Sequence, residues 1–378
     1  LKNIKYLFLF LTFALFACFQ LAQEYDIELL RKQYSSGDYE QWPSPSLDSI
    51  IDPNDFQDIG HLPEVTYPES NPYSDEKKEL GKTLFFDPRL SQSGQIACAS
   101  CHDSEIGWGD GRRASYGHNR SLGRRNAMTL LNVAFADQLF WDGRSSSLED
   151  QVNFPIKDTL EMHFHINLAV SRISKIEGYK SLFQKAFKDT VVTEEAIRKA
   201  IATFERTIIS ESTRFDRFIN GEADRFTDYE VLGLHLFRTK ARCINCHNTG
   251  YFSDNKFHNT GLTYYGRKFE DLGLYEVTSK KEDVGKFKTA SLREISRTGP
   301  YMHNGLFPHL EGIVNLYNAG MPQPKRKNHQ LNDSLFPATS SLLQPLDLSA
   351  KEKYALVSFL KTLESRNKRE TPPDLPNK

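Results

Sequence analysis

Residues 98–102 read CASCH and residues 243–247 read CINCH, so one chain of 378 residues places four of its five cysteines in two identical spacings. Cys-x-x-Cys-His is the attachment signature of a c-type haem. The two thiols of such a motif bind the porphyrin covalently, and the adjacent histidine is held beneath the iron as its proximal ligand. The sequence therefore predicts two covalent haems c, held by Cys98, Cys101 and His102 and by Cys243, Cys246 and His247.

Zinc sites and disulfides are the other structures that this pattern of cysteines can form. A Cys₂His zinc site usually needs a fourth ligand, and the compact motif does not supply one. Two disulfides would suit an exported chain, but they do not require His102 and His247. Haem attachment is the interpretation that uses all six residues, and the other two stay open at this point.

The first 22 residues have the pattern of a secretory signal. Two lysines precede an apolar run over residues 6–17 that is too short to span a bilayer. The run ends in Leu-Phe-Ala-Cys, which resembles a bacterial lipobox with Cys18 as the lipidated first residue of the mature chain. Alternatively, Cys18 is an incidental residue of a signal cleaved nearby, for instance after Ala22. We expect an exported, periplasmic protein, with a lipid anchor in the first case.

The composition is that of an ordinary globular protein, with 39% apolar and 26% charged residues and a formal net charge of −1. This balance argues against nucleic acid as the main partner. The length is sufficient for two domains, each with its own core.

A weak internal repeat supports two related domains. LGKTLF at 80–85 precedes the first CxxCH motif, and LGLHLF at 232–237 precedes the second. Each segment has a helical pattern with a capping signal before it, Ser74 in the first case and the Thr227-x-x-Glu230 box in the second. Two further helices are predicted to begin after Thr193 and after Ser349. Strand-like alternation is scarce, so we expect a mainly α fold of two cytochrome c-like haem domains with long loops.

We divide the chain into five parts on these grounds. They are a signal segment over 1–22, an N-terminal extension over 23–73 that we expect to wrap the first domain, a first haem domain over 74–222, a second haem domain over 223–364 and a flexible tail over 365–378.

From about Asp55 to Lys361 the chain resembles the bacterial di-haem cytochrome c peroxidase family, which includes the MauG-like enzymes. The resemblance rests on six blocks that occur in the family's order. They are LGKTLFFDPRLS, CASCHD, FWDGRSSSLEDQV, RTIISESTRFDRFINGE, CINCH and GKFKTASLREISRTGPYMHNG. It implies that the first haem reacts with peroxide and that the second transfers electrons.

The resemblance also implies roles for residues around the first haem. His118 is the distal ligand, on a mobile loop, and it has to leave before peroxide can bind. Glu161 is the acid–base carboxylate, Gln151 orients peroxide or water, and Trp141 lies between the haems and aids electron transfer. The chemistry needs such a carboxylate, because cleavage of the O–O bond requires a proton to move from the inner to the outer oxygen.

The distal ligand of the second haem departs from the standard peroxidases, which use Met. The matching position is Tyr317, as in MauG-like members, and Met321 is the alternative if the register differs. A thioether ligand raises the reduction potential of a haem, whereas a phenolate favours the oxidised iron. Tyr317 therefore favours higher oxidation states at the second haem.

The family resemblance implies one calcium ion between the haems. Its ligands are Asn126 and the backbone carbonyl groups of Thr298 and Pro300, with water completing the shell. Such oxygen ligands suit calcium better than a transition metal.

Three functions compete at this point. The first is a hydrogen peroxide reductase that receives electrons at the second haem from a small cytochrome c or blue copper protein. The second is a MauG-like oxidase of a protein or organic substrate, and Tyr317 supports it. The third is a non-enzymatic electron carrier, in which Glu161 would have no role. A homodimer is common in the family and is expected here.

Overall fold

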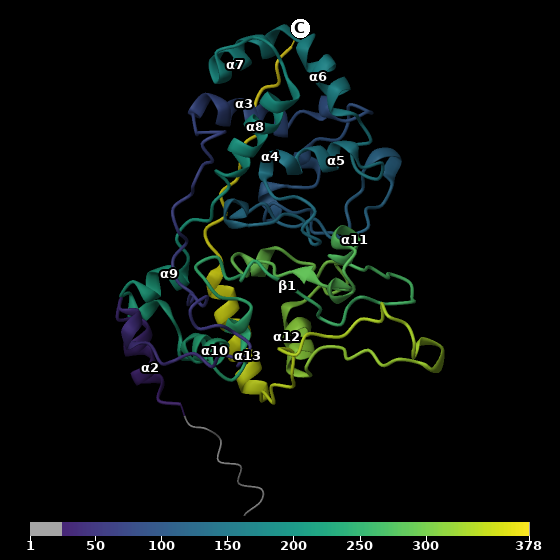
Figure 1. The fold of residues 1–378 in the computed structure, drawn as a ribbon. Coiled ribbons are helices and arrows are strands. Elements are labelled where there is room, and N and C mark those ends of the chain that lie inside the picture. The colour runs from purple at the N-terminus through teal and green to yellow at the C-terminus, as the bar shows by residue number, and fades with distance from the viewer. Residues whose placement is uncertain (1–24, 378) are drawn as a thin grey trace, which may run out of the picture.

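The structure is a computed structural model and describes residues 25–377. The chain forms two lobes (Figure 1). One is built around the pair of helices α3 (Asp75–Phe85) and α8 (Glu194–Glu205), and the other around α10 (Asp228–Arg238) and α13 (Ala350–Leu360). The described chain is mainly helical with long loops, as the sequence predicts.

The predicted signal segment over residues 1–22, with Cys18, lies outside the described residues. Within the part that is described, no helix has the length and apolar character needed to cross a membrane.

The first lobe has a hydrophobic core between its two main helices. Leu80 and Leu84 of α3 are fully buried against Ile197 and Ile201 of α8. The remaining helices of this lobe are α4 (Leu148–Gln151), α5 (Asn153–Lys157), α6 (Ile166–Ser174) and α7 (Glu177–Phe187).

The second lobe has a separate core, in which Leu234 and Phe237 of α10 pack with Phe359 of α13. Its other elements are α2 (Ile27–Tyr34), α9 (Arg214–Ile219), α11 (Tyr275–Thr278), α12 (Leu310–Asn318) and two short antiparallel strands, β1 (Phe257–His258) and β2 (Phe287–Lys288).

The internal repeat of the sequence corresponds to the same helix crossing in each lobe. A Cβ atom at Gly81 of α3 would lie 1.9 Å from the carbonyl oxygen of Ala200 in α8. A Cβ atom at Gly233 of α10 would lie 2.1 Å from the carbonyl oxygen of Ala355 in α13. Glycine is required at both positions because the two backbones are in direct contact.

The helix starts predicted from capping signals are confirmed. Ser74 and Thr193 each accept a hydrogen bond from the backbone N–H three residues later, at 3.2 and 3.1 Å. Thr227 and Ser349 each form a capping box with the glutamate three residues later. These caps satisfy N–H groups that a helix leaves without partners at its first turn.

The first part of the N-terminal extension packs on the second lobe, whereas we expected the extension to wrap the first domain. Its last residues do contact the first lobe, where the Asn71 amide donates to Glu149 at 2.8 Å and to the carbonyl oxygen of Lys199 at 3.0 Å. Tyr34 and Trp42 belong to the core of the second lobe. Both lie against Arg238 of α10, whose guanidinium donates hydrogen bonds to the Tyr34 hydroxyl at 3.1 Å and to the Pro43 carbonyl at 2.6 Å, and pairs with Asp58. The buried arginine needs these acceptors, and the extension supplies all of them.

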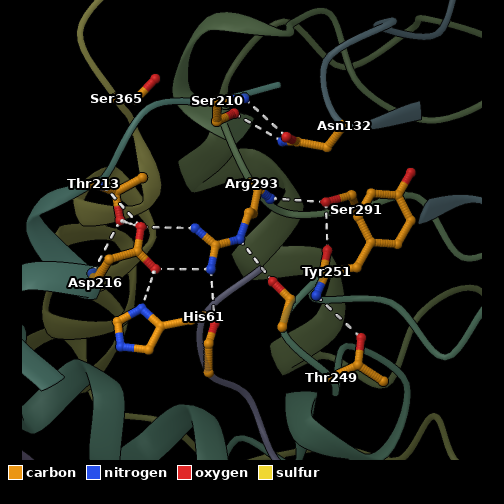
Figure 2. A network of polar contacts seen from close by, with 12 residues as sticks. His61, Asn132, Ser210, Thr213, Asp216, Thr249, Tyr251, Ser291, Arg293 and Ser365 are labelled. Carbon is orange, nitrogen blue, oxygen red and sulfur yellow. Dashed lines mark hydrogen bonds and ion pairs between the residues drawn. The ribbon is translucent and has the colours of Figure 1, made fainter. Parts of the chain in front are cut away.

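A second buried arginine joins the extension to α9 (Figure 2). Arg293 forms two hydrogen bonds with Asp216 of α9, at 2.9 and 3.0 Å, and donates to the carbonyl oxygens of Gly60 and Gly250, both at 2.7 Å. Burial raises the pKa of Asp216, but the hydrogen bonds from Arg293 outweigh this effect and the pKa lies below its usual value. Helix α9 thus packs with the second lobe, although the boundary predicted at residue 222 places it with the first.

The C-terminal residues, predicted as a flexible tail, contact the first lobe. After α13 the chain runs back to the far end of the first lobe and ends beside α7 (Figure 1). Arg89 donates to the carbonyl oxygen of Pro376 at 2.9 Å, and Lys82 forms an ion pair of 2.5 Å with Glu370. The two cations of the first lobe therefore fix a segment whose polar composition alone suggested disorder.

Candidate functional site

The first CxxCH motif forms a single 3₁₀ turn, η3 (Cys98–Ser100), followed by a histidine of defined tautomer. His102 Nδ1 lies 3.0 Å from the carbonyl oxygen of Trp108. A carbonyl group can only accept, so Nδ1 carries the proton and Nε2 keeps a free lone pair for a metal. Burial lowers the pKa of His102, which favours this neutral form.

The second motif repeats this arrangement. It forms the 3₁₀ turn η8 (Cys243–Asn245), and His247 Nδ1 donates to the carbonyl oxygen of Phe252 at 3.1 Å. Burial again lowers the pKa of the histidine. Both motifs thus hold two thiols and one neutral imidazole with Nε2 available, which is the donor set that covalent haem attachment and proximal ligation require.

The described residues form neither the two disulfides nor the Cys₂His zinc site that the sequence left open. All four cysteines of the motifs are free thiols. Within residues 25–377, the cluster of side chains suited to a metal joins Cys246 to Asp254 and His258, with ligand atoms within 4.8 Å of one another. It leaves out Cys243 and His247, so it is not the Cys₂His site considered from the sequence.

A cavity of about 760 Å³ lies beside Cys98, Cys101 and His102. Its volume is in the range of pockets that enclose a cofactor, roughly 300–1,000 Å³. Trp141, Gln151 and Glu161 all line this cavity. The structure thus brings to the first motif the residues predicted for electron transfer, for orientation of peroxide or water, and for proton transfer.

Glu161 lies in the loop after α5 and has the environment of a proton-exchanging group. Burial raises its pKa to about 7, and the nearby carboxylate of Asp158 contributes to the rise, while Arg144 and Arg124 oppose it. A carboxyl group with a pKa near neutrality both gives and takes a proton at physiological pH. Glu161 therefore has the acid–base property that proton transfer between the peroxide oxygens requires.

Trp141 is fixed at the contact between the lobes. Its indole N–H donates to the carbonyl oxygen of Asn126 at 3.0 Å, and its own carbonyl oxygen accepts from the backbone N–H of Lys288 in β2 at 2.9 Å. The indole packs edge-on against His303, with ring centroids 6.4 Å apart, and His303 stacks on Phe287 at 3.6 Å. An aromatic series thus extends from the cavity into the second lobe.

His118 is close to Glu161 along the backbone, but its side chain is not part of the cavity wall. It lies in the turn η5 (His118–Arg120), and its backbone N–H donates to the carbonyl oxygen of Glu161 at 2.7 Å. Its ring packs edge-on against His163 at 4.7 Å, and its Nδ1 is buried without a partner among the described residues. The structure does not bring His118 to His102, so distal ligation stays a prediction.

Tyr317 lies in α12, close to the second motif. Burial raises the pKa of its phenol, and the thiols of Cys246 and Cys243 add to the rise, which places the ring near both cysteines. Met321 follows the end of α12 and is buried, with its backbone N–H bound to the carbonyl oxygen of Leu316. The choice between Tyr317 and Met321 as the distal ligand stays a prediction.

One hydrogen bond joins the two segments that carry the residues predicted to bind calcium. The backbone N–H of Asn126 donates to the carbonyl oxygen of His303 at 2.8 Å, which places Asn126 against the loop with Thr298 and Pro300. The Asn126 amide donates to the carbonyl oxygen of Arg112. Among the hydrogen bonds of the described residues, none is accepted by the carbonyl oxygens of Thr298 and Pro300, so both fit a cation ligand.

Glu205 and Lys288 are among the charged residues of the cavity wall that the sequence did not single out. Glu205 ends α8 and is buried, its Oε2 has no partner among the described residues, and burial raises its pKa to about 8. Lys288 comes from β2 of the second lobe and is 4% exposed. The sequence signal that could have identified Glu205 is a charged residue within an apolar helical pattern, because Glu205 directly follows Phe204 on a helix of buried residues.

Two CxxCH motifs with free thiols, each on a lobe with its own helical core, define a di-haem c-type cytochrome. The profile of the di-haem cytochrome c peroxidase family matches residues 75–224. Methylamine utilization protein MauG of Methylophilus methylotrophus is 36% identical over 302 residues, which cover 79% of this chain and 86% of that protein. Cytochrome-c peroxidase IdrP1 of Pseudomonas sp. (strain SCT) is 34% identical over 334 residues, with 81% and 85% coverage.

The structural comparison agrees with these matches. The crystal structure of a MauG-like protein associated with microbial copper homeostasis has a TM-score of 0.73 and 30% identity, over 85% of this chain and 96% of that one. The chain belongs to the di-haem cytochrome c peroxidase family. Family membership supports haem c as its cofactor and an oxidoreductase activity.

Proposed function

We propose that this protein reduces hydrogen peroxide to water in the periplasm, with electrons from a small cytochrome c or blue copper protein. Electrons enter at the second haem, in the domain over 223–364, and pass through Trp141 to the first haem, in the domain over 74–222. The observation that carries the proposal is the position of Glu161, with its raised pKa, in the cavity beside His102.

The proposed work of the protein side chains is the transfer of one proton. When bound, the haem at His102 supplies the redox chemistry by which peroxide takes up two electrons. Glu161 accepts the proton of the inner oxygen of peroxide and returns it to the outer oxygen, which leaves as water. With two further protons from solvent and two electrons, the remaining oxygen is also converted to water, so the products are two water molecules. Gln151, on the same wall, orients peroxide or water by hydrogen bonding.

Two further parts belong to this proposal. His118 would hold the iron of the first haem in the resting oxidised state, and its position against His163 is where the side chain would lie once it has been released for peroxide. Calcium bound by Asn126, Thr298 and Pro300 holds the loop that packs against Trp141 through His303. Contacts thus link His118 to Glu161, and the predicted calcium-binding loop to Trp141.

The experiment is an assay of peroxide consumption by the holoprotein with a reduced small cytochrome c under anaerobic conditions. Two equivalents of cytochrome should be oxidised for each peroxide consumed. A holoprotein with both haems attached that leaves peroxide and cytochrome unchanged would contradict peroxidase function and would leave the MauG-like oxidase and the electron carrier as the remaining interpretations.

A second candidate is a MauG-like oxidase that acts on a protein or organic substrate through both haems. The position of Tyr317 beside Cys243 and Cys246 supports it, because a phenolate ligand stabilises oxidised iron. Relatives named MauG are as similar to this chain as those named peroxidase. Oxidation of a partner protein by peroxide-treated holoprotein, without reduced cytochrome, would distinguish this function from the first.

A further inference from the structure

We propose that Lys288 holds a propionate carboxylate of the first haem, so that the second lobe binds the cofactor attached to the first. The inference rests on the haem-binding motif at Cys98–His102 and holds for either of the two enzymatic functions considered above.

Lys288 is a buried cation that lacks an anionic partner. Its side chain is 4% exposed and lines the cavity beside the first motif. Among the described residues, its ammonium group forms no hydrogen bond or ion pair, and its nearest recorded contact is the ring of Tyr251, at 5.8 Å from the centroid. Asp137 and Asp254 attract it without contacting it. An unpaired buried ammonium is strongly unfavourable, so an anion is expected in the cavity.

The other cations of the cavity wall are already paired or exposed. Arg125 is bound to Asp142 and Asp271, and Arg144 also pairs with Asp142. Arg124 and Lys157 are exposed at the surface. Within residues 25–377, Lys288 is therefore the buried cation of this cavity that is available for a new anionic partner.

The position of Lys288 fits the chemistry of haem c. The thioether bonds form at the vinyl edge of the porphyrin, and the two propionates project from the opposite edge. Charged groups that act on the thiols of Cys98 and Cys101 include Glu205 and Glu161. Lys288 instead reaches the cavity from β2 of the second lobe, where Asp137 and Asp254 attract its ammonium. A propionate that points away from the cysteines meets the second lobe.

This contact would link the first haem to Trp141 through Lys288. The backbone N–H of Lys288 donates to the Trp141 carbonyl oxygen at 2.9 Å. The same residue would then fix the tryptophan through its backbone and the haem through its side chain. A positive charge beside the propionate also favours the reduced iron, because reduction adds a negative charge.

The test is a spectroelectrochemical titration of the holoprotein at several pH values. In Lys288→Met we expect a lower midpoint potential for the first haem, and a pH dependence that shifts upward because the unpaired propionate takes up its proton more readily. The second haem should keep its potential. Lys288→Arg should keep the wild-type values, since it preserves the charge.

Lys286→Met is the matched control. Lys286 lies two residues away, and its ammonium pairs with Asp283 at 3.0 Å near the surface, so its loss should change neither haem. Wild-type potential and pH dependence in Lys288→Met, with both haems attached, would overturn the proposal. Potentials that vary with chloride or nitrate concentration at constant ionic strength would also overturn it, because they would identify a free anion as the partner of Lys288.

If Lys288→Met fails to retain haem, Lys288→Arg decides the matter. Retention of haem with the wild-type potential in that variant supports the need for positive charge. A potential lowered in Lys288→Arg, despite normal folding by circular dichroism, would contradict it.

Discussion

The backbone N–H of His118 donates a hydrogen bond of 2.7 Å to the carbonyl oxygen of Glu161. The loop that carries the predicted removable ligand is thus directly bonded to the residue that carries the predicted proton-transfer group. Gly117 strengthens this link, because a Cβ atom there would lie 2.0 Å from the carbonyl oxygen of Leu160. When the His118 loop moves, either its hydrogen bond with Glu161 breaks or Glu161 moves with the loop.

Glu161→Gln should retain both haems and lose peroxide turnover by about 10²–10⁴-fold, the usual contribution of a positioned acid–base group. The wild-type rate should rise with pH through about 7, because the deprotonated carboxylate is the form that accepts the first proton. The variant should lose this dependence. Steady-state peroxide consumption between pH 5 and 9 (a range of about two units on either side of that pKa) measures both effects. Full activity in the variant would remove Glu161 from the mechanism.

Gly117→Ala should lower peroxide turnover, because the new methyl group displaces the loop from the backbone of Leu160 and Glu161. Gly123→Ala is the control in the same loop, where a Cβ atom would make only ordinary contacts, at 3.4 Å or more. Turnover and the spin state of the oxidised first haem should change in the first variant alone. Equal behaviour of the two variants would show that the contact with Glu161 is not required.

Tyr317→Met should give the second haem a sulfur-to-iron charge-transfer band in the near infrared and a higher reduction potential, since a thioether favours reduced iron. The wild-type protein should lack this band, and Met321→Leu should leave the spectrum unchanged. Near-infrared spectra of the oxidised proteins make the comparison. A band in the wild type that disappears in Met321→Leu would assign the ligand to Met321 instead.

Gly233→Ala should reduce the free energy of unfolding by about 1–3 kcal/mol, the usual cost of overpacking, because its Cβ atom would meet the carbonyl oxygen of Ala355. Gly312→Ala, in α12 with open space around it, should raise the same quantity by about 0.5–1 kcal/mol through helix propensity. Denaturant unfolding of both variants gives the comparison. Similar stabilities would contradict the close crossing of α10 and α13.

Local patterns predicted the parts of the fold that depend on short sequence distances. The capping residues Ser74 and Thr227 begin helices as expected, and the two LGxxLF segments occupy equivalent crossings. The destination of the extension and the tail depends instead on distant partners such as Arg238 and Arg89, which no local pattern identifies.

The candidate site shows the same difference between features set by local sequence and features set by distant contacts. Glu161, Gln151 and Trp141 were found through family motifs, and all three line the cavity. Glu205 and Lys288 were missed because their burial results from the meeting of separate segments. The side-chain direction of His118 also depends on tertiary contacts, here with His163, and the sequence pattern does not contain it.

The C-terminal segment that binds Arg89 and Lys82 begins in the second lobe and ends on the first. Because this segment is bound to both lobes, the lobes can separate only after its contacts are broken. Thermal unfolding should then be a single cooperative transition, and amide hydrogen exchange in α3 and α13 should report the same global opening. Together with the hydrogen bond between Lys288 and Trp141, the segment over residues 364–377 thus favours melting of the molecule as one unit.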